Sequence, residues 1–330
     1  MVSMQKITAA MFDDLYSSYL DDDDPHLTKE DWRPLLAPAT ERSEEQAGFA
    51  LIDEGRVVGM LGMIFSERTI AGQSRRFCNL HSWFVNEEYR GHSLLLMRPA
   101  LRLKDHTLTD FTPTDRVCEI SKRLGFKELD ARLAILPPYP LARIRGGAEF
   151  VVEPSEIAKQ LRETDVKLLA DHKQDHFGHL LVREGERYCY LIFNRVERHV
   201  MPYCHLHYIS DRDIFARHEA AIRRRLLRAT RGRFVALDAR KIDRLALRGR
   251  MTIPLGTRQL YRPAATGSAG RGGAEIGPAD VDTLYSEIAL LRLTTFPSVR
   301  HSLRQWKRRV RGFLPGVGTD ETAASCQMPT

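Results

Sequence analysis

The sequence predicts an α/β protein with mixed sheets, built as two tandem copies of one unit. Three observations lead to this fold class. The chain has 330 residues, which suits two domains because single domains average roughly 100–200 residues. The segment "GFALIDEGRVVGMLGMIF", Gly48–Phe65, is matched by "GHLLVREGERYCYLIFNRV", Gly178–Val196. A Cys-x-x-His pair follows each segment, as "CNLH" at Cys78–His81 and as "CHLH" at Cys204–His207.

Each matched segment has the pattern of a β-hairpin. An apolar run leads to Glu-Gly, at Glu54-Gly55 and again at Glu184-Gly185, and a second apolar run follows. Two strand-like runs joined by a turn that contains Gly predict a hairpin. Gly55 and Gly185 are 130 residues apart, and Cys78 and Cys204 are 126 apart. The near-constant offset indicates that one structural unit occurs twice.

A helix-like stretch follows each Cys-x-x-His strand, as "SLLLMRPALRLK" and as "DIFARHEAAIRRRLLRAT". We therefore expect each copy to be a mostly antiparallel sheet flanked by helices. The predicted organisation is a first domain at 1–140 and a second domain at 150–262. Residues 263–330 are then a Gly-rich linker followed by a basic amphipathic helix.

Composition favours a globular protein of the cytoplasm. The sequence is 43% hydrophobic and 28% charged, and its longest apolar run, Val57–Phe65, is far shorter than the ~20 residues that span a membrane. The N-terminal residues show no signal-peptide pattern. Five cysteines, an odd and sparse set, favour reduced thiols over disulfides. Residues 1–150 carry 19 basic and 23 acidic side chains, whereas 151–330 carry 31 and 20, so the second half is basic.

The two Cys-x-x-His pairs resemble zinc ligands, but their setting argues against a metal. Both pairs lie in aromatic and apolar stretches typical of strands, where successive side chains point to opposite faces. Cys78 and His81 then face opposite ways, and we expect no metal site. The face that carries Asn79, His81, Trp83 and Val85 is either a polar network inside the core or the wall of a pocket.

The stretch after the first of these strands has the outline of an anion-binding turn. In "VNEEYRGHSLLLMRPAL", Val85–Leu101, a strand leads through a loop into a helix with apolar spacing. The free N–H groups and the dipole at a helix N-terminus favour an anion. Arg90 adds a positive charge, and Gly91 lets the backbone approach a ligand closely.

Together with "SKRLGFKEL", this stretch resembles the GNAT superfamily of acyl-CoA-dependent acyltransferases. The resemblance covers about residues 1–136 and extends weakly over 150–262. It implies that acetyl-CoA or another acyl-CoA is the co-substrate and that no metal is needed. Its pyrophosphate would contact the backbone at Arg90, Gly91, His92, Ser93, Leu94 and Leu95. The pantetheine arm and thioester would lie along Phe84 and Val85.

The resemblance also implies an acceptor site and shows departures from the family pattern. The acceptor would approach Asn79, His81 and Trp83. His81 is the first candidate for the general base, because an unperturbed imidazole titrates near pH ~6.5; Glu87 and Glu88 are alternatives. A core histidine without a catalytic role is the other interpretation. Three positions depart from the family pattern: Ser93, Leu95, and Ser121 in place of the family's tyrosine acid.

The leading hypothesis is an enzyme that transfers an acyl group from acyl-CoA by direct attack. The acceptor would be an amine or hydroxyl of a small molecule, or of a sugar or lipid precursor. The alternative is a catalytically silent tandem binding or scaffold protein. In the second copy, Asp211 and Asp213 occupy the place of the anion turn, so we expect no CoA there.

The basic helix expected at 297–314 has two interpretations: it binds an anionic membrane surface, or it packs onto its own domain. Nucleic-acid binding is supported only by the basic residues of the second half.

Overall fold

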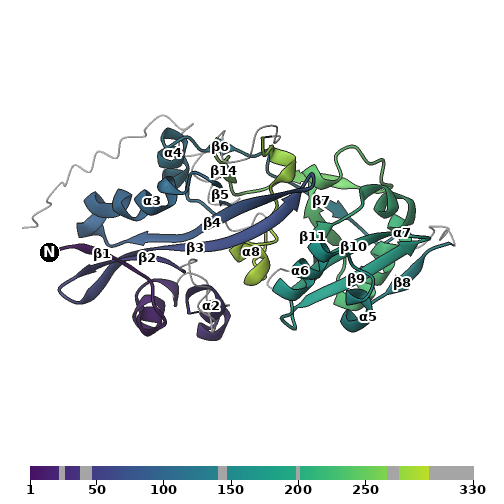
Figure 1. Cartoon of the computed structure of the whole chain (residues 1–330), viewed down its shortest axis with the longest axis horizontal. Coiled ribbons are helices and arrows are strands. Elements are labelled where there is room, and N and C mark those ends of the chain that lie inside the picture. Colours follow the sequence, from purple (N-terminus) through teal and green to yellow (C-terminus); the bar gives the residue numbers. More distant parts are fainter. Residues whose placement is uncertain (22–26, 38–46, 140–146, 198–200, 266–274, 297–330) are drawn as a thin grey trace, which may run out of the picture. The chain divides into compact units, whose positions relative to one another are not determined.

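The computed structural model describes residues 1–21, 27–37, 47–139, 147–197, 201–265 and 275–296. Within these residues the chain forms two seven-stranded sheets, shown in Figure 1. The first has the order β1-β2-β3-β4-β5-β14-β6, where the strands are Ser3–Lys6, Gly48–Asp53, Arg56–Ile70, Gln73–Val85, His106–Asp110, Leu260–Arg262 and Lys127–Glu128. The second, read from its opposite edge, has the order β8-β9-β10-β11-β12-β7-β13, with strands Glu149–Val151, Phe177–Glu184, Arg187–Val196, Tyr203–Ile209, Val235–Asp238, Arg132–Leu136 and Met251–Pro254.

Position by position, the two sheets have the same plan. In each sheet one pair of strands is parallel, β4 with β5 and β11 with β12, and the other pairs are antiparallel. The predicted hairpins are present as β2–β3 and β9–β10, and each turns where a glycine has positive φ, Gly55 at 76° and Gly185 at 62°. The predicted α/β fold of two similar sheets is confirmed.

The two sheets exchange one strand each, which the sequence did not predict. β7 follows β6 in the chain but lies in the second sheet, between β12 and β13. β14 follows β13 but lies in the first sheet, between β5 and β6. Neither of the ranges 1–140 and 150–262 therefore contains every strand of its sheet. The exchange ties the copies into one unit, Met1–Phe296.

Helices cover both faces of the first sheet (Figure 1). α3 (Ser93–Arg102) and α4 (Asp115–Arg123) pack on one face, where Cys78, Leu80, Leu96 and Cys118 belong to one buried cluster. α1 (Phe12–Leu15) and α2 (Lys29–Leu36) pack on the other face. The second copy contributes α5 (Pro154–Ala158), α6 (Glu163–Asp171) and the long α7 (Arg212–Thr230).

A β-bulge changes the alternation of side chains at the end of β4. Between Gly62↔His81 and Met60↔Phe84, β4 carries one residue more than β3, and Ser82 has a φ of 50°. An extra residue in one strand shifts the faces of all that follow. Trp83 consequently packs with the cluster of Cys78 and Leu80, and Phe84 packs on the α2 face. The prediction that Trp83 and Val85 share a face with His81 was therefore wrong.

The C-terminal part of the described chain runs against both copies. Asp282 forms a buried ion pair with Arg68 of β3, 2.9 Å apart, and lies 3.5 Å from Lys241 of the second copy. The short helix α8 (Glu287–Leu290) follows, with Glu287, Ile288 and Ala289 buried. The basic helix expected at 297–314 lies outside the described residues.

Candidate active site

The first sheet opens where β4 and β5 part. The two strands pair from Arg76↔His106 to Leu80↔Asp110, where β5 ends, and β4 continues to Val85. Among the described residues, no strand pairs with 81–85 on the β5 side. The backbone of this part of β4 is thus available to a ligand, because strand edges bind extended chains through N–H and C=O groups.

A cavity of about 350 Å³ lies at this opening. Four stretches line it: the region of α2 with Trp32, the end of β4 from Leu80 to Phe84, the residues after β5 from Asp110 to Val117, and the C-terminal stretch with Glu287. The start of α4 is fixed there because the Thr114 hydroxyl accepts a hydrogen bond from the N–H of Val117 at 3.3 Å. Side chains from four separate parts of the chain therefore meet in one cavity.

Two buried carboxyl groups, Asp110 and Glu287, share this cavity. They are 8% and 2% exposed. Asn79 donates to Glu287 Oε2 at 2.5 Å, and the Thr112 hydroxyl donates to Glu287 Oε1 at 2.7 Å. The N–H of Thr112 also donates to Asp110 Oδ1 at 3.4 Å. Thr112 thus contacts both carboxyls and holds them in the same part of the cavity.

Burial perturbs the titration of both groups. Desolvation, together with the charge of Glu287, raises the pKa of Asp110 well above its ordinary value. Desolvation also raises the pKa of Glu287, but the hydrogen bonds from Thr112 and Asn79 oppose the rise by stabilising the carboxylate. Burial and the neighbouring charge thus favour the neutral form of Asp110, whereas the two hydrogen bonds favour the charged form of Glu287.

His81 lines the same cavity as a neutral imidazole. It is 3% exposed, and burial lowers its pKa to about 4, below the unperturbed value of 6.5 that made it a candidate base. Its ring stacks on Trp32 with centroids 6.5 Å apart. His81 Nε2 and Trp32 Nε1 are both buried without a hydrogen-bond partner among the described residues. A base with a pKa this low is a poor match for proton abstraction at neutral pH.

The position of His81 depends on Gly62 of the neighbouring strand. A Cβ atom built on Gly62 would lie 2.3 Å from Cε1 and Nε2 of the imidazole. Any side chain at position 62 would displace the ring from its place against Trp32. The glycine is therefore part of the site although it carries no functional group.

The predicted anion turn lies just beyond the open end of β4. The residues expected to form a loop, from Arg90 onward, instead belong partly to a 3₁₀ helix, Glu87–His92, that leads directly into α3. Glu87, a proposed base, is exposed and pairs with Arg90, with 2.9 Å between Glu87 Oε1 and Arg90 Nη1. A Cβ on Gly91 would meet nothing within 4 Å. The structure places Glu87 outside the cavity and leaves space at Gly91.

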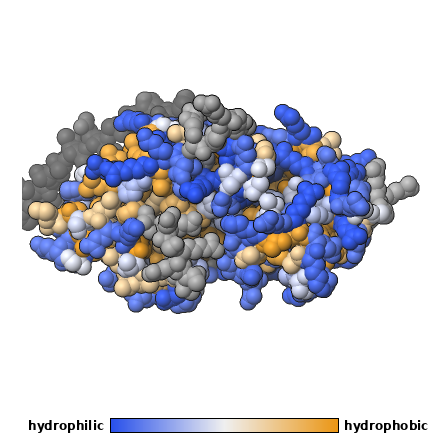
Figure 2. Space-filling model, viewed as in Figure 1, coloured by the Kyte–Doolittle hydropathy of each residue, from blue (hydrophilic) through white to orange (hydrophobic). Residues whose placement is uncertain are grey.

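The remaining predicted positions lie on α3 and α4. Ser93 begins α3, and Leu94 and Leu95 in its first turn are 54% and 37% exposed. Figure 2 shows hydrophobic side chains at the surface over α3. Ser121 is buried and does not line the cavity. The first turn of α3 thus presents apolar side chains, and the N–H of Ser93 donates to the carbonyl of Arg90 in the preceding 3₁₀ helix.

The second copy differs at the equivalent helix start. Asp211 caps α7 by accepting hydrogen bonds from the N–H groups of Asp213 and Ile214, each at 3.0 Å. Its carboxylate occupies the N–H groups that a phosphate would use. Cys204 packs in the buried cluster of this copy with Leu206. The described residues contain no group of three or more His, Cys, Asp or Glu side chains arranged for a metal.

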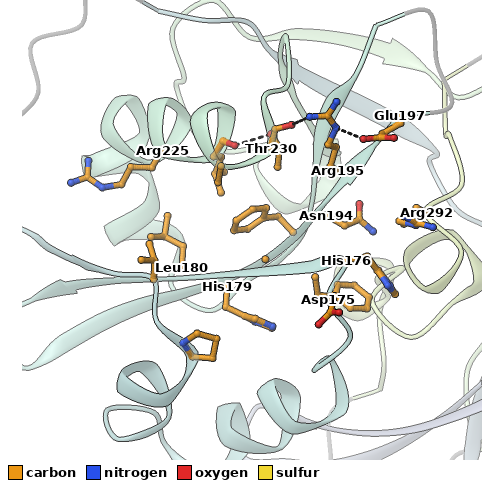
Figure 3. A pocket seen from close by; sticks show the side chains of 17 residues that line it. Asp175, His176, His179, Leu180, Asn194, Arg195, Glu197, Arg225, Thr230 and Arg292 are labelled. Carbon is orange, nitrogen blue, oxygen red and sulfur yellow. Dashed lines mark hydrogen bonds and ion pairs between the residues drawn. The ribbon is translucent and has the colours of Figure 1, made fainter.

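The second copy has a larger cavity of its own, of about 460 Å³, between β9, β10 and α7. Figure 3 shows its side chains, with Arg225 and Arg292 at opposite ends. Arg195 pairs with Glu197 at 2.6 Å, and Arg292 pairs with Asp31 at 3.1 Å. Arg225 and Arg292 lie at opposite ends of this cavity, and two of its arginines already pair with carboxylates, so it is a weaker candidate for chemistry.

The sequence analysis missed Asp110, Glu287, Trp32 and Thr112. Asp110 ends the strand-like run "HTLTD" and was detectable as a carboxyl at a strand end. Glu287 was not detectable, because it lies 177 positions after Asp110 and no spacing rule links the two residues. The structure places His81 in the lining of the cavity and Asn79 against Glu287, and their catalytic role stays a prediction.

No helix among the described residues is long and apolar enough to cross a membrane. No protein-family model matches the sequence, and no curated protein matches it.

Solved structures with a similar fold are known. A GCN5-related N-acetyltransferase from Kribbella flavida is 16% identical, with a TM-score of 0.53 over 79% of this chain and 70% of its own. A probable N-acyltransferase from Enterococcus faecalis V583 is 11% identical, with a TM-score of 0.54 over 81% and 74%. A GCN5-related N-acetyltransferase from Anabaena variabilis is 10% identical, with a TM-score of 0.50 over 79% and 72%. The chain therefore has the fold of GNAT acetyltransferases, as its resemblance to that superfamily implied.

Proposed function

We propose that the protein is an acyl-CoA-dependent acyltransferase whose reaction takes place in the first copy. The observation that carries the proposal is the open end of β4, which lies between a helix start with room for phosphates and a cavity with two buried carboxyls. The GNAT-type fold supports the same activity at the level of the superfamily. Acetyl-CoA is the simplest co-substrate.

Three parts of the site would each contact a different part of acyl-CoA. The N–H groups at the start of α3, from Arg90 to Leu95, would bind the pyrophosphate, with Arg90 as an adjacent positive charge. The exposed Leu94 and Leu95 would border the ligand. The edge of β4 at Phe84 and Val85 would pair with the pantetheine arm and direct a backbone N–H at the thioester carbonyl.

The reaction would be a direct attack of the acceptor on the thioester, without a covalent enzyme intermediate. Cys78 is fully buried in the cluster against α3 and α4 and does not line the cavity. His81 is neutral and weakly basic, and it shapes the cavity rather than taking the proton. The second copy would support the first, because β7 and β14 connect the two sheets.

A calorimetric titration of acetyl-CoA into the wild type and Arg90→Glu tests the proposal. We expect micromolar binding to the wild type and a loss of about tenfold or more in the variant, because the variant places an anion beside the phosphates. Lys159→Glu is the matched control: Lys159 is also an exposed cation in an i,i+3 pair, 2.7 Å from Glu156, but lies in the second copy. The Lys159→Glu variant should bind acetyl-CoA with the same affinity as the wild type.

The alternative is a tandem binding or scaffold protein that keeps this fold without catalysis. Two observations favour it: Ser121 stands where the resemblance places a tyrosine acid, and Leu95 lies where a small residue is usual. A folded wild type that binds neither acetyl-CoA nor a longer acyl-CoA would support this alternative. An acceptor screen that yields CoA release would exclude it.

A further inference from the structure

We infer that the acceptor is a compact amine that enters the 350 Å³ cavity as an ammonium ion without an acidic group of its own, and that Glu287, with Asp110 beside it, binds its nitrogen and accepts its proton. The inference rests on the proposed acyl transfer for the chemistry, but the amine-binding part is independent of CoA.

The charge of the cavity is the first argument. Among the described residues, its lining contains two carboxyl groups and neither a lysine nor an arginine. Asp110 and Glu287 are both nearly inaccessible, and a buried carboxylate without a cation is costly. The buried carboxylate of Asp282 has such a partner in Arg68, whereas the buried Asp165 is held by the hydroxyls of Tyr188 and Tyr208. An ammonium ligand would supply the missing positive charge at Glu287.

The geometry of Glu287 is the second argument. Each of its oxygens accepts one hydrogen bond, Oε2 from Asn79 and Oε1 from Thr112. A carboxylate offers about four acceptor sites, so both oxygens can still accept from an ammonium N–H. Asn79 is itself fixed, because its Oδ1 accepts from the Thr109 hydroxyl at 3.0 Å. The carboxylate is therefore held in one orientation before a ligand arrives.

The other residues that line the cavity indicate the shape and polarity of the acceptor beyond its ammonium group. Trp32, Trp83, Phe84 and Leu293 supply aromatic and apolar surface, which suits a hydrophobic body and stabilises a nearby cation through the ring faces. A carboxylate or phosphate on the acceptor would face Asp110 and Glu287 and be repelled.

The proton balance of the transfer follows from these positions. The ammonium gives one proton to Glu287, whose pKa burial has raised, and becomes a nucleophilic amine. Its nitrogen forms a bond to the thioester carbon, and the bond from that carbon to sulfur then breaks. The leaving thiolate takes the second nitrogen proton and becomes CoA thiol. Glu287 returns the first proton to solvent, so one amide, one thiol and one proton are produced.

Three probes with one aromatic body test the acceptor class: phenethylamine, phenylalanine and 2-phenylethanol. Binding is measured first, without CoA, by ligand-observed NMR on the full chain. We expect phenethylamine to bind at least about tenfold more tightly than either other probe. Glu287→Gln should remove this preference, since the glutamine keeps the shape but loses the charge. Glu156→Gln, an exposed carboxylate on the second copy, should leave the preference unchanged.

Transfer is measured next, as amide formed and thiol released from acetyl-CoA. Glu287→Gln should lower kcat/KM for phenethylamine by about 10²-fold or more while acetyl-CoA affinity stays within about twofold of the wild type. Asn79→Leu, which frees Glu287 from one hydrogen bond, should give a smaller loss and shift the pH profile of kcat/KM toward higher pH.

The outcomes separate the two proposals. If acetyl-CoA does not bind but phenethylamine binds in a Glu287-dependent way, the acyl transfer is wrong and the amine site stands. If acetyl-CoA binds but phenylalanine is bound or acetylated as well as phenethylamine, the acceptor class is wrong. No binding of any probe, or a Glu287→Gln variant that only melts earlier and keeps the amine preference, also overturns it.

Discussion

The titration of His81 gives the sharpest test of the site's electrostatics. In the unfolded chain an imidazole has a pKa of 6.5, whereas burial lowers the pKa of His81 in the folded protein to about 4. Between these values the unfolded state binds the proton and the folded state does not. Stability therefore falls as the pH is lowered from about 7 toward 4, because protons favour the unfolded chain.

The two pKa values set the size of the effect. Linkage of one proton gives a loss of about 2 kcal/mol in the free energy of unfolding between pH 7 and pH 5. Other groups titrate in the same range, including the buried carboxyls, whose raised pKa values act in the opposite direction. The difference between the wild type and His81→Gln cancels these contributions, because both proteins share them.

Urea unfolding at pH 7 and pH 5, followed by tryptophan fluorescence, measures the difference. The wild type should lose about 2 kcal/mol more than His81→Gln over this interval. Equal losses in the two proteins would mean that His81 titrates normally in the folded state. In that case the account of its burial is wrong, and His81 regains its place as the first candidate for the general base.

Two further substitutions test the framework of the site. Gly62→Ala places a methyl group against the His81 ring and should destabilise the fold by about 1–3 kcal/mol in urea unfolding, while Gly91→Ala, in open space, should change stability by less than about 1 kcal/mol; equal effects would contradict the close approach at Gly62. Arg68→Met leaves Asp282 without its nearest cation and should cost about 3–5 kcal/mol, less where Lys241 compensates. A wild-type unfolding midpoint for Arg68→Met would show that the buried pair does not hold the C-terminal segment.

The repeated local patterns could be predicted from the sequence, because a hairpin depends on neighbouring residues. The turns at Gly55 and Gly185 and the strands around Cys78 and Cys204 are examples. The exchange of β7 and β14 between the sheets could not be predicted, because strand propensity does not specify which sheet a strand joins. The bulge at Ser82 was also hidden, since one extra residue leaves no mark in an alternating pattern, and it moved Trp83 to the other face.

The sequence predicted two residues that lie at the candidate site, His81 and Asn79, but not its two buried carboxyl groups. His81 was chosen for the ordinary titration of imidazole, and burial against Trp32 removed that property. Asp110 and Glu287 acquire their role only through folding, when the C-terminal segment crosses the end of β5. Side chains that are distant in sequence and coupled through a buried hydrogen-bond network leave no local signal.

Hydrogen–deuterium exchange with and without acetyl-CoA tests the central claim, that acyl-CoA binds to the first copy alone. The account predicts slower exchange in peptides that cover 84–95, at the end of β4 and the start of α3. Peptides that cover 208–216, at the equivalent place in the second copy, should exchange at the same rate in both samples. Protection at 208–216, or no protection at 84–95, would contradict the proposed site.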